Sequence, residues 1–145
     1  MLSPDFKEFV GLLIQHKVEY LIVGGYAVGI HGHPRYTGDL DIWLNPTEEN
    51  AHKIVHCIND FGFESFGLKA SDFTKSGNII QLGYPPLRID LLNQIDGVTF
   101  TEAYSNRLNI EIDDLFVDFI GYKDLMANKK ASGRLRDLDD LEQLQ

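Results

Sequence analysis

The sequence contains few cysteines and few positive charges. Its single cysteine, Cys57, cannot form an internal disulfide, so we expect the chain to function in the reducing cytoplasm. Lysine and arginine total 13 against 22 aspartates and glutamates, which leaves a formal net charge of −9. Non-specific nucleic-acid binding depends on excess positive charge, so this composition argues against a nucleic-acid coat protein. Positive charges gather near the C-terminus, where Arg134 and Asp137 have the spacing of an ion pair.

Long apolar stretches, repeats and low-complexity tracts are also missing. No apolar run approaches the roughly 20 residues that cross a membrane, so no membrane association is expected. Residues 1–8 lack the basic start and apolar segment of a signal peptide. No linker divides the chain, and 43% of its 145 residues are hydrophobic. We therefore expect residues 1–145 to form one domain with a substantial core.

Apolar periodicity and turn residues predict an α/β (α+β) fold. The sequence favours a mixed β-sheet flanked by helices, with two helices at the C-terminus, because strands follow strands in the second half of the chain. Ser3 and Thr47 are suited to begin helices. Helices are expected at residues 5–16, 26–30, 48–59, 122–130 and 134–144, and strands at 18–23, 39–44, 62–65, 73–75, 79–82, 87–92, 107–112 and 115–120.

Three aspartates stand in apolar segments that are expected to be strands. Asp39 and Asp41 lie in the segment 39–44, and Asp90 lies in the segment 87–92. Residues two apart on a strand share a face, about 7 Å apart, so Asp39 and Asp41 project together and a neighbouring strand can bring Asp90 beside them. Close carboxylates repel one another unless a cation faces them. We interpret the three as a divalent-cation site; the alternative is pairing with arginine or lysine side chains.

A glycine turn completes an ordered pattern. Gly24 and Gly25 follow the strand expected at 18–23, thirteen residues separate Gly25 from Asp39, and Asp90 lies on a later strand. This order resembles the DNA polymerase beta-like nucleotidyltransferase superfamily, over residues 18–142. The segments 35–41, 121–125 and 134–141 are similar to its minimal bacterial branch, which includes the abortive-infection type II toxin nucleotidyltransferases.

The resemblance implies a site with two Mg²⁺ ions. Asp39 and Asp41 are expected to bind both ions, while Asp90 binds the ion nearest the acceptor and helps to take the proton of its hydroxyl group. Gly24 and Gly25 are expected to contact the triphosphate, because phosphate can approach a backbone that carries no side chain. Many members of the superfamily have serine at the position of Gly25, so this chain departs from the pattern there.

Three further residues are candidates for nucleotide contact. Arg35 precedes the acidic strand, where it can bind phosphate or the acceptor or pair with Asp39. Thr37 is a second candidate, with hydrogen bonding to the turn backbone as the structural alternative. The resemblance suggests a lysine near the triphosphate on the helix at 122–130, and Lys123 or Lys130 can take that position.

These observations favour an Mg²⁺-dependent nucleotidyltransferase. The expected reaction transfers a nucleoside monophosphate from a nucleoside triphosphate to a hydroxyl group and releases pyrophosphate. If the toxin resemblance extends to biology, the acceptor is a tRNA end or a protein and an antitoxin partner is expected; a small antibiotic is the alternative acceptor. The alternative from a different functional class is a nucleotide-binding or interaction module without catalytic turnover. Gly25 in place of serine is the feature that supports this alternative.

Overall fold

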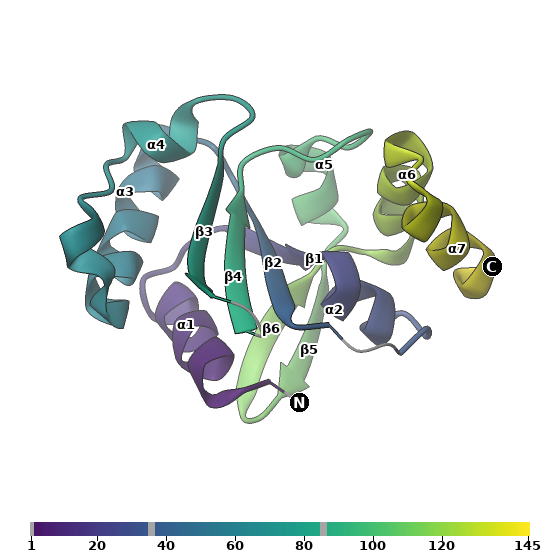
Figure 1. Cartoon of the computed structure of the whole chain (residues 1–145), viewed down its shortest axis with the longest axis horizontal. Coiled ribbons are helices and arrows are strands. Elements are labelled where there is room, and N and C mark those ends of the chain that lie inside the picture. Colours follow the sequence, from purple (N-terminus) through teal and green to yellow (C-terminus); the bar gives the residue numbers. More distant parts are fainter. Residues whose placement is uncertain (1, 35–36, 85–86) are drawn as a thin grey trace.

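A six-stranded mixed sheet forms the centre of the computed structural model, which describes residues 2–34, 37–84 and 87–145 (Figure 1). The strands are β1 (Tyr20–Val23), β2 (Asp39–Leu44), β3 (Ile79–Tyr84), β4 (Leu87–Leu92), β5 (Leu108–Ile112) and β6 (Leu115–Phe119). Their order across the sheet is β3-β4-β2-β1-β6-β5. β2 pairs parallel with β4 and β1 parallel with β6, while the β1–β2, β3–β4 and β5–β6 pairs are antiparallel.

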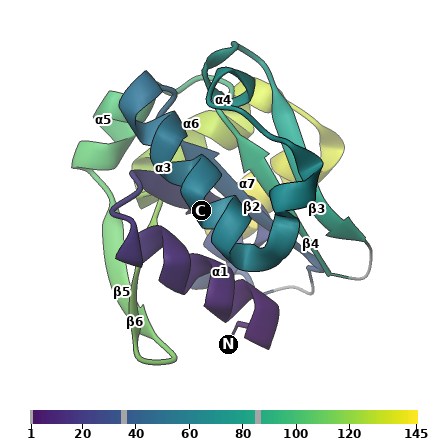
Figure 2. The same ribbon diagram turned by 90° about the vertical axis from the view of Figure 1, so that its left-hand side faces the viewer.

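Helices lie on both sides of this sheet. They are α1 (Pro4–Gln15), α2 (Gly24–Ile30), α3 (Glu48–Ile58), α4 (Ser71–Thr74), α5 (Phe100–Ser105), α6 (Tyr122–Ser132) and α7 (Leu135–Leu144). α1 and α3 lie in front of one face of the sheet (Figure 2), whereas α2, α6 and α7 lie on the opposite side (Figure 1). Within the part of the chain that the structure describes, no helix is both long and apolar enough to cross a membrane.

The core lies between the sheet and the helices α1 and α3. Both helices begin where the sequence predicted, because Ser3 and Thr47 each accept a backbone N–H of the first helical turn through the side-chain oxygen. Every residue of β1 is buried, as expected for a strand that is covered on both faces. The side of α1 that faces the sheet buries Phe6, Phe9, Val10 and Leu13, and that of α3 buries Asn50, Ala51, Ile54, Cys57 and Ile58.

Residues 62–65 are not a strand, contrary to the sequence prediction. They belong to helical turns over residues 59–66 that continue from the end of α3, with Gly62 at a φ of 107°. Phe61 packs edge-on against Phe9 of α1, with 5.1 Å between the ring centroids. The aromatic residues of this segment therefore pack against a helix, and their side chains do not alternate across a sheet.

Residues 73–75 are also not a strand. Their first part belongs to α4, a single helical turn, in which the carboxylate of Asp72 accepts the backbone N–H of Lys69 at 2.8 Å. The structure adds α5, for which no helix was predicted. Its sequence carried the necessary signal, because Phe100 and Ala103 are three residues apart and both are buried. The other predicted helices and strands are present, with ends shifted by a few residues.

Candidate functional site

The pairing of β2 with β4 brings the three aspartates together. The strands are parallel, with Asp41 opposite Asp90 and Asp39 opposite Arg88. Because side chains alternate along a strand, Asp39 and Asp41 project from one face of β2 while the buried Leu40 projects from the other. Asp90 is itself buried, with 7% of its surface exposed. The register therefore places Asp90 beside the other two carboxylates on one face of the sheet.

Arg88 holds two of these carboxylates through direct hydrogen bonds. Its Nε donates to Oδ1 of Asp90 at 2.7 Å, and its Nη2 donates to Oδ2 of Asp90 at 3.1 Å and to Oδ2 of Asp39 at 3.1 Å. The arginine pairing that the sequence left as an alternative is thus present. Arg88 was not named from the sequence, although its position two residues before Asp90 on a strand puts both side chains on one face.

Asp41 lies in an environment that disfavours its charge. Burial raises the pKa of Asp41 to about 7, and the charges of Asp90 and Asp39 act in the same direction. Hydrogen bonding with Asp90 raises the pKa of Asp41 further, while the positive charge of Lys129 lowers it. A cation next to Asp41 would relieve this unfavourable charge. Shifts of this kind are typical of functional carboxyl groups, although ion-pair networks also produce them.

Gly24 allows the carboxylate of Asp41 to lie against the turn after β1. Its φ of 66° falls in the left-handed region, which side chains other than glycine rarely adopt. A Cβ atom at this position would also overlap with Oδ2 of Asp41. Both the backbone conformation and the neighbouring carboxylate therefore require glycine at residue 24.

Gly25 contacts Thr37. A Cβ atom on Gly25 would lie 3.0 Å from Cβ of Thr37, so a side chain at this position would require Thr37 to shift. The hydroxyl of Thr37 donates to the backbone oxygen of Asp39 at 3.2 Å, as the structural alternative for this residue predicted. Gly25 and Thr37 line a cavity of about 480 Å³ that is separate from the one containing Asp41. Arg35, the remaining candidate near this turn, lies outside the described residues.

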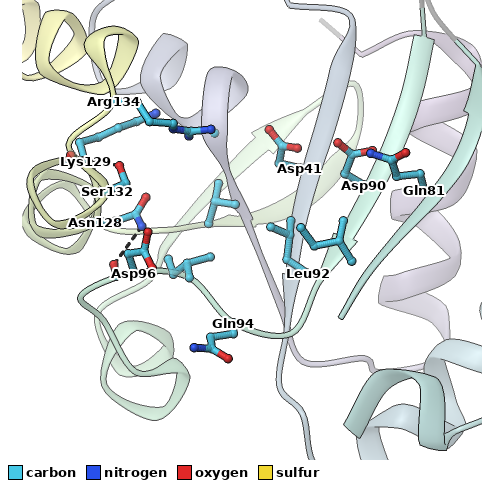
Figure 3. Close-up of a pocket in the computed structure, with 14 residues that line it drawn as sticks. Asp41, Gln81, Asp90, Leu92, Gln94, Asp96, Asn128, Lys129, Ser132 and Arg134 are labelled. Carbon is cyan, nitrogen blue, oxygen red and sulfur yellow. Dashed lines mark hydrogen bonds between the residues drawn. The ribbon is translucent and has the colours of Figure 1, made fainter. Parts of the chain in front are cut away.

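The carboxylates Asp41 and Asp90 open into a pocket of about 450 Å³ between the sheet and the C-terminal helices (Figure 3). One side is formed by β2, β3 and β4, the opposite side by α6 and the start of α7, and the loop after β4 closes the lower edge of the view. A pocket of this volume is in the range that binds small molecules. Its lining consists of Val23, Gly24, Asp41, Ile79, Gln81, Asp90, Leu92, Gln94, Ile95, Asp96, Asn128, Lys129, Ser132 and Arg134.

Buried ion pairs join α6 to α7 behind the pocket. Lys129, with 4% of its surface exposed, lies 3.0 Å from Oδ1 of Asp137 and 3.3 Å from Oδ2 of Asp140. Arg134 donates from Nε to Asp137 at 2.7 Å, which confirms the predicted pair. Burial alone would raise the pKa of Asp137, but hydrogen bonds from Arg134, Ser132 and Lys129 outweigh it and hold that pKa well below its usual range. These contacts fix the helical wall of the pocket.

Lys123 is not brought to this pocket. It is exposed and lines a different hollow, together with Asn106 and Gly121. Lys129 lines the pocket instead, six residues further along α6 and so on another side of that helix. Lys130, the second lysine considered from the sequence, is exposed and is not among the residues lining the pocket. The sequence did not single out Lys129, because its partners are contributed by a different helix.

A second group of potential metal ligands lies outside the pocket. One side-chain atom from each of His33, Asp139 and Asp140 falls within 4.8 Å of the other two. Asp139 is exposed on α7, and none of the three lines the pocket. Asp140 is buried and already pairs with Lys129, and exposed acidic groups such as Asp139 are common in proteins, so we assign this group no role.

The donor atoms of the three aspartates fit a hard divalent cation; Asp41 and Asp90 line the pocket, and Asp39 lies next to them on the same face of the sheet. Asp39, Asp41 and Asp90 offer carboxylate oxygens, which are the ligands that Mg²⁺ prefers. Softer ligands are missing, because neither cysteine nor histidine occurs among the described residues that line the pocket. The glycine at residue 24 keeps the Asp41 carboxylate free of steric overlap. These residues therefore suit Mg²⁺ better than a thiol- or imidazole-bound metal such as zinc.

No family model matches this chain, and no curated protein sequence matches it. Solved structures do match, along nearly the whole chain. A candidate nucleotidyltransferase from Thermotoga maritima superposes with a TM-score of 0.66 at 14% sequence identity, covering 98% of this chain and 93% of that one. The lincomycin-bound lincosamide antibiotic adenylyltransferase LnuA gives a TM-score of 0.58 at 13% identity and covers 99% of this chain and 96% of its own.

An antigenic nucleotidyltransferase-like protein from Paracoccidioides brasiliensis gives a TM-score of 0.57 at 15% identity, covering 97% of this chain and 74% of that one. Similarity at such low identity shows the fold. The mixed six-stranded sheet with its C-terminal helix pair is thus a nucleotidyltransferase fold, which confirms the fold class predicted from the sequence.

Replacing Gly24 tests whether this residue is required beside Asp41. We expect Gly24→Ala to lower the free energy of unfolding by about 1–3 kcal/mol, because alanine strains the backbone and displaces the carboxylate. Gly11→Ala is the matched control, since Gly11 lies inside α1 and a Cβ atom there would meet no atom within 4 Å. Urea unfolding measures both variants, and equal stabilities would contradict the requirement at residue 24.

The raised pKa of Asp41 predicts a pH dependence of stability in the metal-free protein. Between the unfolded value of 3.8 and the folded value of about 7, the folded state binds more protons, so Asp41 makes the protein less stable as the pH rises through this range. Asp41→Asn should remove this contribution. Urea unfolding in a metal chelator, at several pH values between about 4 and 8, measures the difference between the two proteins. A difference that does not change with pH would contradict the predicted shift.

The buried Lys129 predicts a large effect of its removal. We expect Lys129→Met to lower the free energy of unfolding by about 3 kcal/mol, because two buried carboxylates then lose a shared cation. Lys130→Met is the control, since Lys130 is the exposed neighbour on the same helix and should change stability by less than about 0.5 kcal/mol. Similar midpoints of thermal unfolding for the two variants would show that the buried ion pairs do not hold α6 to α7.

Proposed function

We propose that this protein is an Mg²⁺-dependent nucleotidyltransferase that moves a nucleoside monophosphate from a nucleoside triphosphate to a hydroxyl group. The observation that carries this proposal is the β2–β4 register, which puts Asp41 beside Asp90 at one end of a pocket, with Asp39 next to them on the same face of the sheet. The nucleotidyltransferase fold supports it independently. Carboxylates that crowd together on one face of a sheet are otherwise an unfavourable arrangement, which a bound divalent cation would stabilise.

Asp39, Asp41 and Asp90 would hold the cation, which supplies charge neutralisation to the triphosphate and to the attacking oxygen. Asp90 accepts the proton of the acceptor hydroxyl, as the resemblance suggests. A bond then forms between that oxygen and the α-phosphorus, while the bond from the α-phosphorus to the bridging oxygen breaks and pyrophosphate leaves with the electron pair. The chain's own contribution is to place the proton acceptor and the cation ligands on one rigid sheet.

The glycine turn and the helical wall would position the nucleotide. Gly24 presents its backbone to the pocket without a side chain, which supports a role in phosphate contact. Arg134 lines the opposite wall, with most of its side chain exposed, and offers a guanidinium group that suits phosphate. We do not assign this role to Lys123, because it lies outside the pocket.

For the acceptor, a tRNA end or a protein, with an antitoxin as partner, follows from the toxin-like sequence segments. A small hydroxyl-bearing molecule such as an antibiotic is the second candidate. The similarity to lincomycin-bound LnuA over 99% of this chain favours it, together with a net charge of −9 that disfavours a large RNA footprint. We place the reaction in the cytoplasm, where the buried thiol of Cys57 stays reduced, and assign it to residues 1–145 as one domain.

A labelling experiment tests the proposed activity. The protein is incubated with each radiolabelled nucleoside triphosphate, Mg²⁺ and either total cell extract or a panel of hydroxylated antibiotics. We expect label on one acceptor class, release of pyrophosphate and a loss of at least about 100-fold in Asp41→Asn. Asp118→Asn is the control, because Asp118 lies on a strand but pairs with Arg107 away from the pocket.

The labelling experiment, combined with calorimetry, separates the enzyme from a non-catalytic module. Gly25 packs against Thr37, so the serine found in many members of the superfamily would fit here only if Thr37 shifted; this is the feature that favours a module. Calorimetry that detects nucleotide binding, without labelling of any acceptor or release of pyrophosphate, would contradict the proposed activity and support the module.

A further inference from the structure

The guanidinium group of Arg88 forms hydrogen bonds to carboxylate oxygens that a metal ion would need as ligands. It contacts both oxygens of Asp90 and one oxygen of Asp39, at distances between 2.7 and 3.1 Å. Paired contacts to one carboxylate are the strongest geometry available to arginine. Among the hydrogen bonds between described residues, none joins Arg88 to Asp41, so the third carboxylate of the cluster is not held in this way.

Arg88 offsets the repulsion between the carboxylates when no metal is bound. Asp39 and Asp90 come from neighbouring strands and lie close enough to accept from the same nitrogen of Arg88, so their charges would otherwise repel. A divalent cation placed among the same oxygens would do the same with twice the charge. The guanidinium group of Arg88 and a divalent cation at the same oxygens would repel each other. At a separation of about 5 Å this repulsion costs several kcal/mol, even at an effective dielectric constant of about 20.

The side chain of Arg88 is partly open to solvent. It is 25% exposed, whereas the side chain of Asp90 is 11% exposed, so solvent already reaches the guanidinium end of the pair. A charged group that is partly hydrated loses less on moving into water than a fully buried one. Moving Arg88 away from the cluster therefore costs less than moving a fully buried arginine would.

We propose that Arg88 is a built-in competitor of the divalent cation, which releases at least one of Asp39 and Asp90 when the ion binds. The proposal rests on the proposed function, because it takes the carboxylate cluster as the metal site. It makes Arg88 the residue that sets the affinity of the site for the ion. In the metal-free protein the same residue keeps the ligands close together, ready for exchange.

Metal binding to Arg88 variants tests the proposal without any assay of activity. Calorimetry with Mg²⁺ and Mn²⁺ compares the wild type with Arg88→Met, which keeps the length of the side chain and removes its charge. We expect Arg88→Met to bind the ions at least about tenfold more tightly, because a repelling cation is gone. Its midpoint of thermal unfolding in chelator should be lower than that of the wild type, and Mg²⁺ should raise it by a larger amount.

Arg107→Met is the matched control, because Arg107 also pairs with an aspartate, Asp118, at 3.5 Å, and Asp118 is not one of the proposed metal ligands. Its affinity for the ions should equal that of the wild type. A second measurement needs no substitution: the Nε–H resonance of Arg88 in the intact protein should shift on addition of Mg²⁺, while that of Arg107 stays in place. This readout remains decisive if Arg88→Met does not fold.

The outcomes separate this inference from the proposed function. Unchanged or weaker ion binding by Arg88→Met, with an Arg88 resonance that Mg²⁺ does not move, would show that Arg88 supports the ligands and does not compete for them; nucleotidyl transfer by the wild type would then still stand. Absence of ion binding in both the wild type and Arg88→Met would overturn the inference and also remove the metal site on which the proposed function depends.

Discussion

The parallel pairing of β2 with β4 is the constraint on which the site depends. It puts Asp41 directly opposite Asp90, and it leaves the alternate residues of both strands in the core, where they cannot shift without exposing apolar surface. A slip of one residue in either strand would turn its carboxylates into the core. The hydrophobic core therefore fixes the positions of the three carboxylates, and Arg88 offsets part of the repulsion between them.

The second half of the site depends on charge pairing between helices. Lys129 on α6 is buried against Asp137 and Asp140 on α7, and Arg134 adds a further contact to Asp137. These ion pairs lock the two C-terminal helices into a wall that faces the sheet across the pocket (Figure 3). Strand register thus positions one side of the pocket, and buried ion pairs position the other. The stability of the ion-paired side depends on the charge states of its residues, and so on pH.

The sequence was sufficient for features that depend on local spacing. Alternation along a strand put Asp39 and Asp41 on one face, and the caps at Ser3 and Thr47 marked two helices correctly. It was insufficient where contacts join distant segments. Lys129 was missed because its carboxylate partners lie on the next helix, and Arg88 because its contact with Asp39 crosses to another strand, although its spacing from Asp90 was visible. The prediction for residues 62–65 was wrong because this segment forms helical turns that continue from α3, and the neighbouring Phe61 packs against α1, a contact that local spacing does not encode.

The central claim is that the carboxylates of β2 and β4 hold a divalent cation. The most direct measurement is a crystal structure of the protein with Mn²⁺ and a non-hydrolysable nucleoside triphosphate, using the anomalous signal of the metal to locate it. We predict Mn²⁺ bonded to oxygens of Asp41 and Asp90, with the triphosphate beside Gly24. Mn²⁺ bound only elsewhere, for instance between His33 and Asp139, with Asp41 and Asp90 not bonded to metal, would contradict the claim.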